Sequence, residues 1–270
     1  MNRTRACLLA PLLLVATPSA AQDAEDYICL IEPAMVVALG APVEGIIETI
    51  NAVRGAQVRK GDVIAELESG VEKETVRIAE ARANSTYGVD IAEARVDLAE
   101  KQFERADSLV KRKAGTKADR DIAEADLTAA RLELLQAREN AVTAEMEASR
   151  ARAALERRRI RAPIDGIMLR RLIGPGEFAH SQAQIVQLAS VDPLYVDVFL
   201  PTSLYNEVSV GQKAIVKPME PIGGTYEATI DAIDQVFDAA SDTFGVRLEL
   251  PNPGAKLPGG VDCTLILPTS

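Results

Sequence analysis

The chain of 270 residues carries 40 acidic and 30 basic side chains, which gives a formal net charge of −10 at neutral pH. This charge is a poor match for nucleic acid and anionic lipid, because both repel an acidic protein, and proteins are the expected partners. Apolar residues make up 47% of the chain and aromatic residues 4%, with Ala, Glu and Arg concentrated in the middle third. The composition is typical of a globular protein with a long helical segment, and it excludes a disordered chain.

Residues 1–21 have the pattern of a secretory signal peptide. Two arginines precede an apolar run from Ala6 to Ala16, and small residues stand at Ser19 and Ala21. This pattern predicts cleavage after Ala21 and export to an oxidising compartment. The alternative is an uncleaved anchor, but the run is far shorter than the ~20 residues that a membrane-spanning helix needs.

An internal repeat organises the rest of the chain. Ala-Pro-Val-Glu-Gly-Ile at 41–46 returns as Ala-Pro-Ile-Asp-Gly-Ile at 162–167, an offset of 121 residues that also carries Leu67 onto Leu188. The constant register argues against the alternative, a chance similarity. Short β-branched runs punctuated by Gly and Pro predict short strands with tight turns in each copy. These runs are 45–50 and 63–67 in the first copy and 166–172 and 185–188 in the second.

Between the two copies the apolar period changes from that of a strand to that of a helix. Apolar residues recur in alternating steps of three and four, which is the spacing of a coiled-coil seam. They are Val89, Ala92, Val96, Ala99, Phe103, Ala106 and Val110, and then Ala123, Leu127, Ala130, Leu134, Ala137, Ala141, Ala144, Ala148, Ala151 and Leu155. The pattern predicts an antiparallel helical hairpin with limbs of about 71–112 and 117–158, each ~60 Å long.

Two local features qualify the hairpin. Ala-Gly-Thr-Lys at 114–117 predicts the turn, with Gly115 at positive φ and Thr116 and Asp119 forming a Thr-x-x-Asp helix start. The stretch 82–88 is the weak part of the first limb, because the seam register breaks there and Gly88 is expected to interrupt the helix.

After residue 190 the sequence again predicts strands, separated by Gly-rich and Pro-rich turns. A short helix is expected at 202–208, with Thr202 as its cap. Several short strands with one helix predict a small closed barrel, and a β-sandwich is the alternative that periodicity does not separate from it. The predicted strands are 194–200, 214–217, 226–237, 243–250 and 261–267.

This arrangement resembles the periplasmic adaptor, or membrane fusion protein, family, which includes HlyD-like proteins and adaptors of resistance-nodulation-division (RND) efflux pumps. The resemblance is carried by the half-motifs at 41–47 and 161–167, the Val-Arg-Lys-Gly-Asp-Val-Ile turn at 58–64 and the hairpin tip. It implies an α+β multidomain fold in which two lipoyl-like halves form one barrel-sandwich hybrid. The implied order is an N-terminal segment at 22–37, half-motifs at 38–70 and 159–190 flanking a coiled-coil hairpin at 71–158, and a β-barrel at 191–270.

The resemblance also implies a function without chemistry. Adaptors of this kind act in the periplasm, where a homo-oligomeric ring, commonly of six copies, links an inner-membrane transporter of RND or ABC type to an outer-membrane TolC-type channel. RND adaptors usually add a membrane-proximal domain built from both chain ends. The short segments outside the predicted modules lead us to expect that this domain is reduced or missing here.

Family members that dock onto TolC-type channels carry Arg-x3-Leu-x6-Ser across the hairpin tip. Arg105, Leu109 and Thr116 occupy these positions here, with Thr in place of Ser. A guanidinium makes forked hydrogen bonds and an exposed Leu is an apolar anchor, so the resemblance implies a channel-docking tip. The alternative is that Arg105 solvates its helix, Leu109 closes the hairpin and Thr116 only caps.

Three other functions compete with the adaptor. The single histidine, His180, has no Cys, His or carboxylate cluster near it at metal spacing, so neither catalysis nor a metal or cofactor is expected. A lipoyl or biotinyl carrier would need a Lys at a tip where this chain has Glu-Ser-Gly-Val at 68–71, and Lys73 is already expected to be helical. A structural coiled-coil scaffold does not explain the flanking β halves.

Cys29 and Cys263 are the cysteines left after the predicted processing, and they lie in the first and last predicted strands. An oxidising compartment favours disulfides. The family topology brings the two chain ends together at the base of the barrel, and therefore implies that these cysteines pair. The alternative is two buried free thiols.

Overall fold

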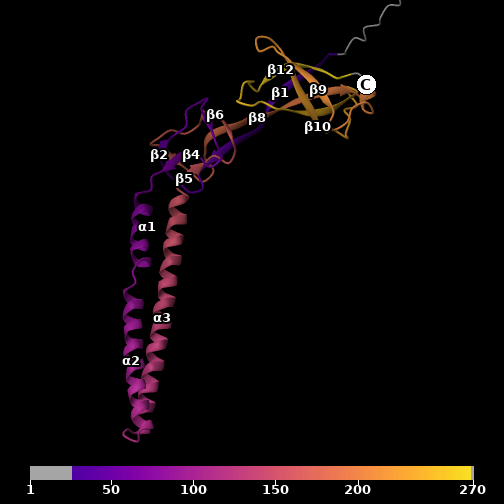
Figure 1. The fold of residues 1–270 in the computed structure, drawn as a ribbon. Helices are drawn as coiled ribbons and strands as arrows, with labels where there is room; N and C mark the ends of the chain where they lie inside the picture. The colour runs from indigo at the N-terminus through magenta and orange to yellow at the C-terminus, as the bar shows by residue number, and fades with distance from the viewer. Residues whose placement is uncertain (1–25, 269–270) are drawn as a thin grey trace, which may run out of the picture. The chain divides into compact units, whose positions relative to one another are not determined.

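The structure, a computed structural model, describes residues 26–268. The predicted signal peptide and its cleavage site after Ala21 lie outside the described residues. The chain folds as two compact units (Figure 1). Within the described residues, one unit joins 26–32 with 192–268, and the other comprises Pro33–Val191.

The two copies of the repeat fold with the same strand spacing. β2 (Gly45–Ile50), β3 (Gln57–Val58) and β4 (Val63–Leu67) recur 121 residues later as β6 (Gly166–Arg171), β7 (Phe178–Ala179) and the start of β8 (Gln184–Pro201). The pairing repeats as well, since β2 pairs with β4 and β7, and β6 pairs with β8 and β3. The short second strand of each copy therefore pairs with the first strand of the other copy, and the two copies form one module.

The core of this module has the same symmetry. The side chains buried in one copy have buried equivalents at the 121-residue offset, and each contributes roughly 1.5–3 kcal/mol when fully buried. These are Ile47, Ile64 and Leu67, with their equivalents Met168, Ile185 and Leu188, all at most 1% exposed. Gly55 and Gly176, also equivalent, turn the chain at φ values of 81° and 85°, which other residues adopt only at a cost.

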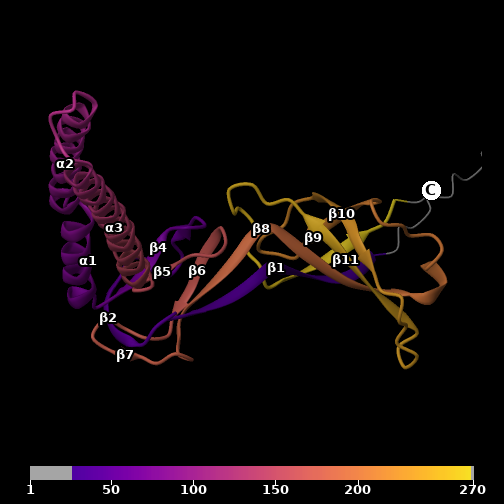
Figure 2. The ribbon, with the colours of Figure 1, turned by 90° about the horizontal axis from the view of Figure 1, so that it is seen from below.

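A helical hairpin stands between β4 and β5 (Arg159–Arg161) and contains α1 (Gly70–Ala83), α2 (Tyr87–Lys111) and α3 (Lys117–Glu156). α1 and α2 follow one another along α3 (Figures 1 and 2). Every predicted seam residue is buried or half-buried, and Ala92, Ala99, Leu127, Ala130, Ala148 and Ala151 are buried. The predicted seam therefore joins the two limbs.

The first limb differs from its prediction because it is two helices rather than one. The interruption lies at 84–86, and Gly88 is inside α2, so the prediction that Gly88 interrupts the helix was wrong. Asn84, Ser85 and Thr86 favour caps and turns, since their side chains compete with the helical backbone for hydrogen bonds. The Thr86 hydroxyl donates to Asp90 Oδ2 at 2.8 Å.

Ion pairs connect the limbs along the hairpin. Four arginines reach carboxylates on the opposite limb at N–O distances between 2.6 and 2.9 Å, and the paired side chains are about half exposed. Each exposed pair contributes at most about 1 kcal/mol. The pairs are Arg95–Glu133, Arg131–Glu100, Arg138–Glu93 and Arg152–Glu80.

The other unit contains a closed β-barrel. Its strands are β1 (Asp26–Gly40), β12 (Val261–Ile266), β9 (Lys213–Pro218), β10 (Tyr226–Ile233), β11 (Thr243–Leu250) and β8, paired in that order. β1 also pairs with β8, which closes the barrel and rules out the β-sandwich alternative.

Two predictions about this region were wrong. β8 is one strand from Gln184 to Pro201, where separate strands at 185–188 and 194–200 were expected. Leu194, Val196, Val198 and Leu200 alternate buried with more exposed neighbours, as in a strand with one face in the core. The expected helix at 202–208 is a single 3₁₀ turn, Thr202–Leu204, and the Thr202 hydroxyl donates to Asp242 Oδ1 at 2.7 Å instead of capping.

Candidate functional site: the hairpin tip and its support

The turn that closes the hairpin begins directly after α2. The Lys113 N–H donates to the Val110 carbonyl at 3.0 Å and the Ala114 N–H to the Leu109 carbonyl at 2.8 Å, which is the hydrogen-bond pattern of a Schellman motif. That motif needs a left-handed residue, and Lys113 fills the position at φ 61°. The prediction that Gly115 has positive φ was therefore wrong.

Gly115 has a different role in the turn. A Cβ built on Gly115 would lie 3.0 Å from Leu109 Cβ and 3.4 Å from the Leu109 carbonyl carbon. A side chain at residue 115 would force Leu109 to move by a few tenths of an ångström, so the glycine allows the chain to return to α3 at this close distance. Gly115 thus lies against the base of Leu109, whose side chain is 48% exposed.

Thr116 starts α3 as the sequence predicts. Its hydroxyl accepts a hydrogen bond from the Asp119 N–H at 3.1 Å and donates to Asp119 Oδ2 at 2.6 Å. The helix cap therefore uses the hydroxyl proton and one lone pair. This geometry fits the predicted Thr-x-x-Asp helix start.

The other two predicted tip residues are available for contact. Arg105 and Leu109 are both exposed and stand one helical turn apart on α2, so their side chains share a face. No ion pair involving Arg105 is found among the described residues. The structure therefore places a cation and an apolar side chain together at the end of the hairpin, and Thr116 follows Gly115 beside Leu109.

An ion-pair cluster that the sequence did not reveal lies just below the tip. Asp107 Oδ2 is 2.6 Å from Lys111 Nζ and Asp107 Oδ1 is 3.0 Å from Arg120 Nε. The hydrogen bonds from Lys111 and then Arg120 hold the pKa of Asp107 below its ordinary value. Arg120 also lies over the Phe103 ring, 5.4 Å from its centroid, so it ties α3 to α2.

The base of the hairpin is fixed by Arg158. Its guanidinium bonds to Glu72 Oε1 at 2.6 and 3.0 Å and to the Glu44 carbonyl at 3.0 Å. A Cβ on Gly45 would lie 2.8 Å from Arg158 Nη1, so a side chain there would displace the guanidinium from the Glu44 carbonyl. These contacts join α1 and the end of α3 to the split β module.

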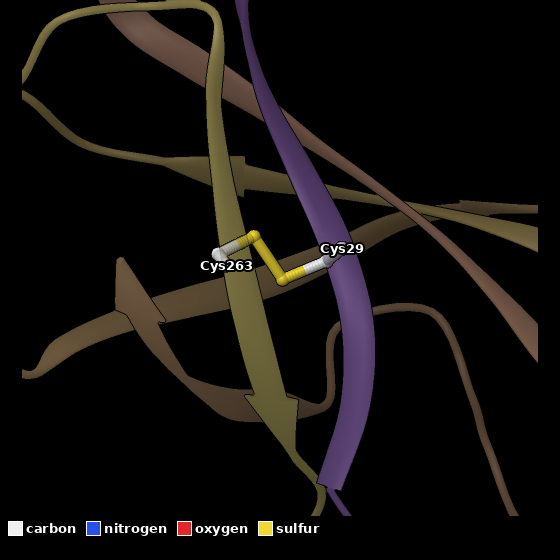
Figure 3. The surroundings of a disulfide bond; sticks show 2 residues. All are labelled: Cys29 and Cys263. Atoms are coloured by element: carbon white, nitrogen blue, oxygen red, sulfur yellow. A yellow bond between two sulfur atoms is a disulfide. The ribbon is translucent and has the colours of Figure 1, made fainter. Parts of the chain in front are cut away.

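Cys29 and Cys263 form a disulfide in the structure (Figure 3). They are direct partners in the antiparallel pairing of β1 with β12, with Cα atoms 4.8 Å apart, and both are buried. The bond connects strands from the two ends of the described chain within the barrel.

The carrier alternative finds no attachment point at the expected turn. β4 ends at Leu67, α1 begins at Gly70, and Lys73 lies within α1. Residues 26–268 contain no group of three or more His, Cys, Asp or Glu side chains that could hold a metal ion. In the same range no helix is both long and apolar enough to cross a bilayer.

Comparison with known families agrees with this architecture. The CzcB-like barrel-sandwich hybrid domain matches residues 35–190, and the CusB-like β-barrel domain matches residues 193–269. The chain belongs to the membrane fusion protein family.

The chain is similar in sequence to two proteins whose names refer to efflux and metal resistance. The efflux pump periplasmic linker BepD of Brucella suis is 28% identical over 248 residues, which cover 86% of this chain and 59% of BepD. The cobalt-zinc-cadmium resistance protein CzcB of Cupriavidus metallidurans is 25% identical over 209 residues, 77% of this chain and 38% of CzcB. The chain thus spans about half the length of these curated relatives.

A solved structure shows the same fold. The crystal structure of MacA from Actinobacillus actinomycetemcomitans matches with a TM-score of 0.72 and 25% identity, over 90% of this chain and 77% of MacA. The match extends over the greater part of both chains, so the order of modules in this membrane fusion protein is that of a solved relative.

Proposed function

We propose that this protein is a periplasmic adaptor subunit of a tripartite efflux or secretion system. It would link an inner-membrane transporter of RND or ABC type to an outer-membrane TolC-type channel. The observation that carries the proposal is the hairpin tip, where exposed Arg105 and Leu109 share one face at the end of a helical pair. The names of BepD and CzcB, a periplasmic linker of an efflux pump and a metal-resistance protein, support a role in export.

The experiment reverses the charge at the tip and leaves the seam unchanged. Arg105→Asp and Leu109→Ser are each expected to retain full helix content, because neither residue belongs to the seam between the limbs. Each should reduce crosslinking of the tip to the TolC-type channel and reduce export. If Leu109 is a hot spot, Leu109→Ser should weaken the binding free energy between tip and channel by roughly 2 kcal/mol or more. The measurements are circular dichroism, site-specific crosslinking and an export assay.

The matched control is Arg150→Asp, which makes the same charge change on α3. Arg150 is exposed and, like Arg105, has no ion pair among the described residues. It lies near the other end of the hairpin. If the crosslinking and export of Arg105→Asp and Leu109→Ser equal those of the Arg150→Asp control, the hairpin tip is not the docking site.

A homo-oligomeric ring, for which the resemblance implies six copies, is part of the same proposal. α3 carries a second apolar seam, made of Leu132, Leu135, Val142 and Met146, which are 55–67% exposed. Their steps of three, seven and four residues fit a heptad pattern offset from the seam that meets α2. Ile91 and Leu98, seven residues apart and more than half exposed, form a shorter stripe on α2.

A ring needs two different surfaces that fit one another, because each copy contacts one neighbour through each. The α3 seam of one hairpin against the α2 stripe of the next would supply such a pair. We expect Leu135→Asp with Val142→Asp to retain helix content and to shift sedimentation toward the monomer. Ser149→Asp, on the same face but without loss of an apolar side chain, is the control. An unchanged sedimentation profile would refute this seam.

A further inference from the structure

The cations of the hairpin divide into two groups. Along the hairpin below the tip, the four interhelical arginines are matched by carboxylates, as are Arg120 and Lys111 just below the turn. At the turn itself, Arg112, Lys113 and Lys117 are exposed and have no ion pair among the described residues. Three cations without an ion pair therefore lie within six residues at the turn, whereas other exposed cations without one, such as Lys73, Arg82 and Arg150, are spread over the rest of the hairpin.

The local charge is opposite to that of the whole protein. Residues 104–120 contain six basic and three acidic side chains, a net charge of +3, on a chain whose net charge is −10. The backbone holds this charge outward, because Lys113 occupies the left-handed position of the turn and Lys117 is the first residue of α3. A lysine at a helix N-terminus is unfavourable to the helix dipole, so stability of the hairpin does not explain Lys117.

We propose that Arg112, Lys113 and Lys117, which lie within eight residues of the exposed Leu109 at the same turn, form a basic docking surface whose partner is an acidic protein rim on the outer-membrane channel. This inference rests on the proposed function, and names the chemistry of the surface that the tip meets. A basic end on an acidic protein orients the approach to an acidic target and raises the association rate.

An anionic lipid surface is the less favoured partner. Peripheral binding to a bilayer requires apolar side chains buried in the interface as well as cations. Within the turn from 109 to 117, Leu109 and Val110 are the large apolar residues, and Val110 belongs to the seam. One exposed leucine is a suitable anchor for a protein pocket and a poor one for a membrane.

The test compares two variants with identical charge changes. The tip variant is Arg112→Glu with Lys113→Glu and Lys117→Glu. The control is Lys73→Glu with Arg82→Glu and Arg150→Glu, which replaces three exposed cations without ion pairs elsewhere on the hairpin. Association with a TolC-type channel in nanodiscs without anionic lipid is measured at low and high NaCl. Arg105 and Leu109 are retained in both variants.

We expect the tip variant to associate at least ~10-fold more slowly at low salt and the control to match the wild type, because reversed charges at a contact act mainly on the association rate. The difference should shrink at high salt, where a short Debye length screens exposed charges. Arg112→Gln with Lys113→Asn and Lys117→Gln should have an intermediate rate, and Asn tolerates the left-handed position if Glu disturbs the turn.

Three results would overturn the inference. The first is equal rates for the tip variant and the control while Arg105→Asp still impairs docking, which leaves the proposed function intact. The second is binding of the wild type, and not of the tip variant, to vesicles containing phosphatidylglycerol, with channel association unaffected. The third is a wild-type protein that does not associate with the channel, which contradicts the proposed function as well.

Discussion

Gly115 lies directly against Leu109, and a Cβ on Gly115 would stand 3.0 Å from Leu109 Cβ. Contacts this short force a neighbour to move, and the backbone of Leu109 is also within 3.4 Å. We therefore expect Gly115→Ala to displace the tip and to lower the free energy of unfolding of the hairpin by about 1 kcal/mol. Thermal melting of the helical circular dichroism signal measures the change.

Gly88→Ala is the matched substitution. Gly88 lies in the first turn of α2, and a Cβ there would meet nothing within 4 Å. The added methyl group should stabilise the helix by up to about 1 kcal/mol, because Ala loses less conformational freedom than Gly. Changes of the same sign in both variants would contradict the packing described for Gly115.

The ion pair at the hairpin base should matter more than those on its surface. Arg158 and Glu72 are 24% and 21% exposed, whereas Arg77 and Glu74 in α1 are 76% and 60% exposed. Glu72→Gln leaves a half-buried guanidinium without its countercharge and should lower the free energy of unfolding by about 1–2 kcal/mol. Glu74→Gln should change it by less than about 0.5 kcal/mol. Chemical denaturation followed by circular dichroism compares the two variants. Equal changes in the free energy of unfolding would refute the special role of the Arg158–Glu72 ion pair.

The Cys29–Cys263 disulfide should stabilise the barrel. It closes a loop with a sequence separation of 234 residues, and loss of a native disulfide costs about 2–5 kcal/mol. Cys29→Ala with Cys263→Ala should lower the denaturation midpoint of the barrel, followed by near-ultraviolet dichroism of its tyrosines, and dithiothreitol should do the same to the wild type. Thiol labelling of the denatured, unreduced wild type should find no free thiol at these positions; two labelled cysteines would disprove the bond.

Acid should weaken the hairpin just below its tip. The bonds from Lys111 and Arg120 hold the pKa of Asp107 below its ordinary value of 3.8, so folding favours the ionised carboxylate. This contribution is complete above the ordinary aspartate pKa and is lost as the pH falls through the lowered value in the folded protein. The melting temperature of the hairpin, followed by its helical circular dichroism signal, should therefore decline in that acidic range. Asp107→Asn should be less stable than the wild type at neutral pH, and its melting temperature should fall less on acidification. An equal pH dependence of the two melting temperatures would contradict the role given to the Asp107 carboxylate.

Strand positions in the repeat could be read from the sequence because the two copies carry the same turn glycines and core positions. Gly45–Ile50 and Val63–Leu67 coincide with β2 and β4 for this reason. The left-handed residue of the tip could not be predicted, because the Schellman bonds select a position and Lys113 occupies it despite the glycine two residues later. The prediction divided β8, a single strand that pairs with β6 up to Ala189 and with β11 from Leu194 to Pro201.

Some residues of the candidate site could be predicted and others could not. The resemblance selected Arg105 and Leu109, and the sequence itself indicates only that they stand four residues apart on one helix. The partners of Arg120 and Arg158 come from other elements and depend on the packing of α3 against α2 and α1. The disulfide was inferred from the family topology, because residue types alone leave paired and free cysteines equally allowed.

The strands that flank the hairpin are neighbours in one sheet. β4 pairs antiparallel with β5, Glu66 stands opposite Arg159, and the Leu67 N–H donates to the Arg158 carbonyl at 2.8 Å. Residues 70–156 are therefore the connection between two neighbouring antiparallel strands, and this connection contains all three α-helices of the described residues. Insertion or removal of matched heptads in both limbs would change the reach of the tip and leave every strand pairing in place.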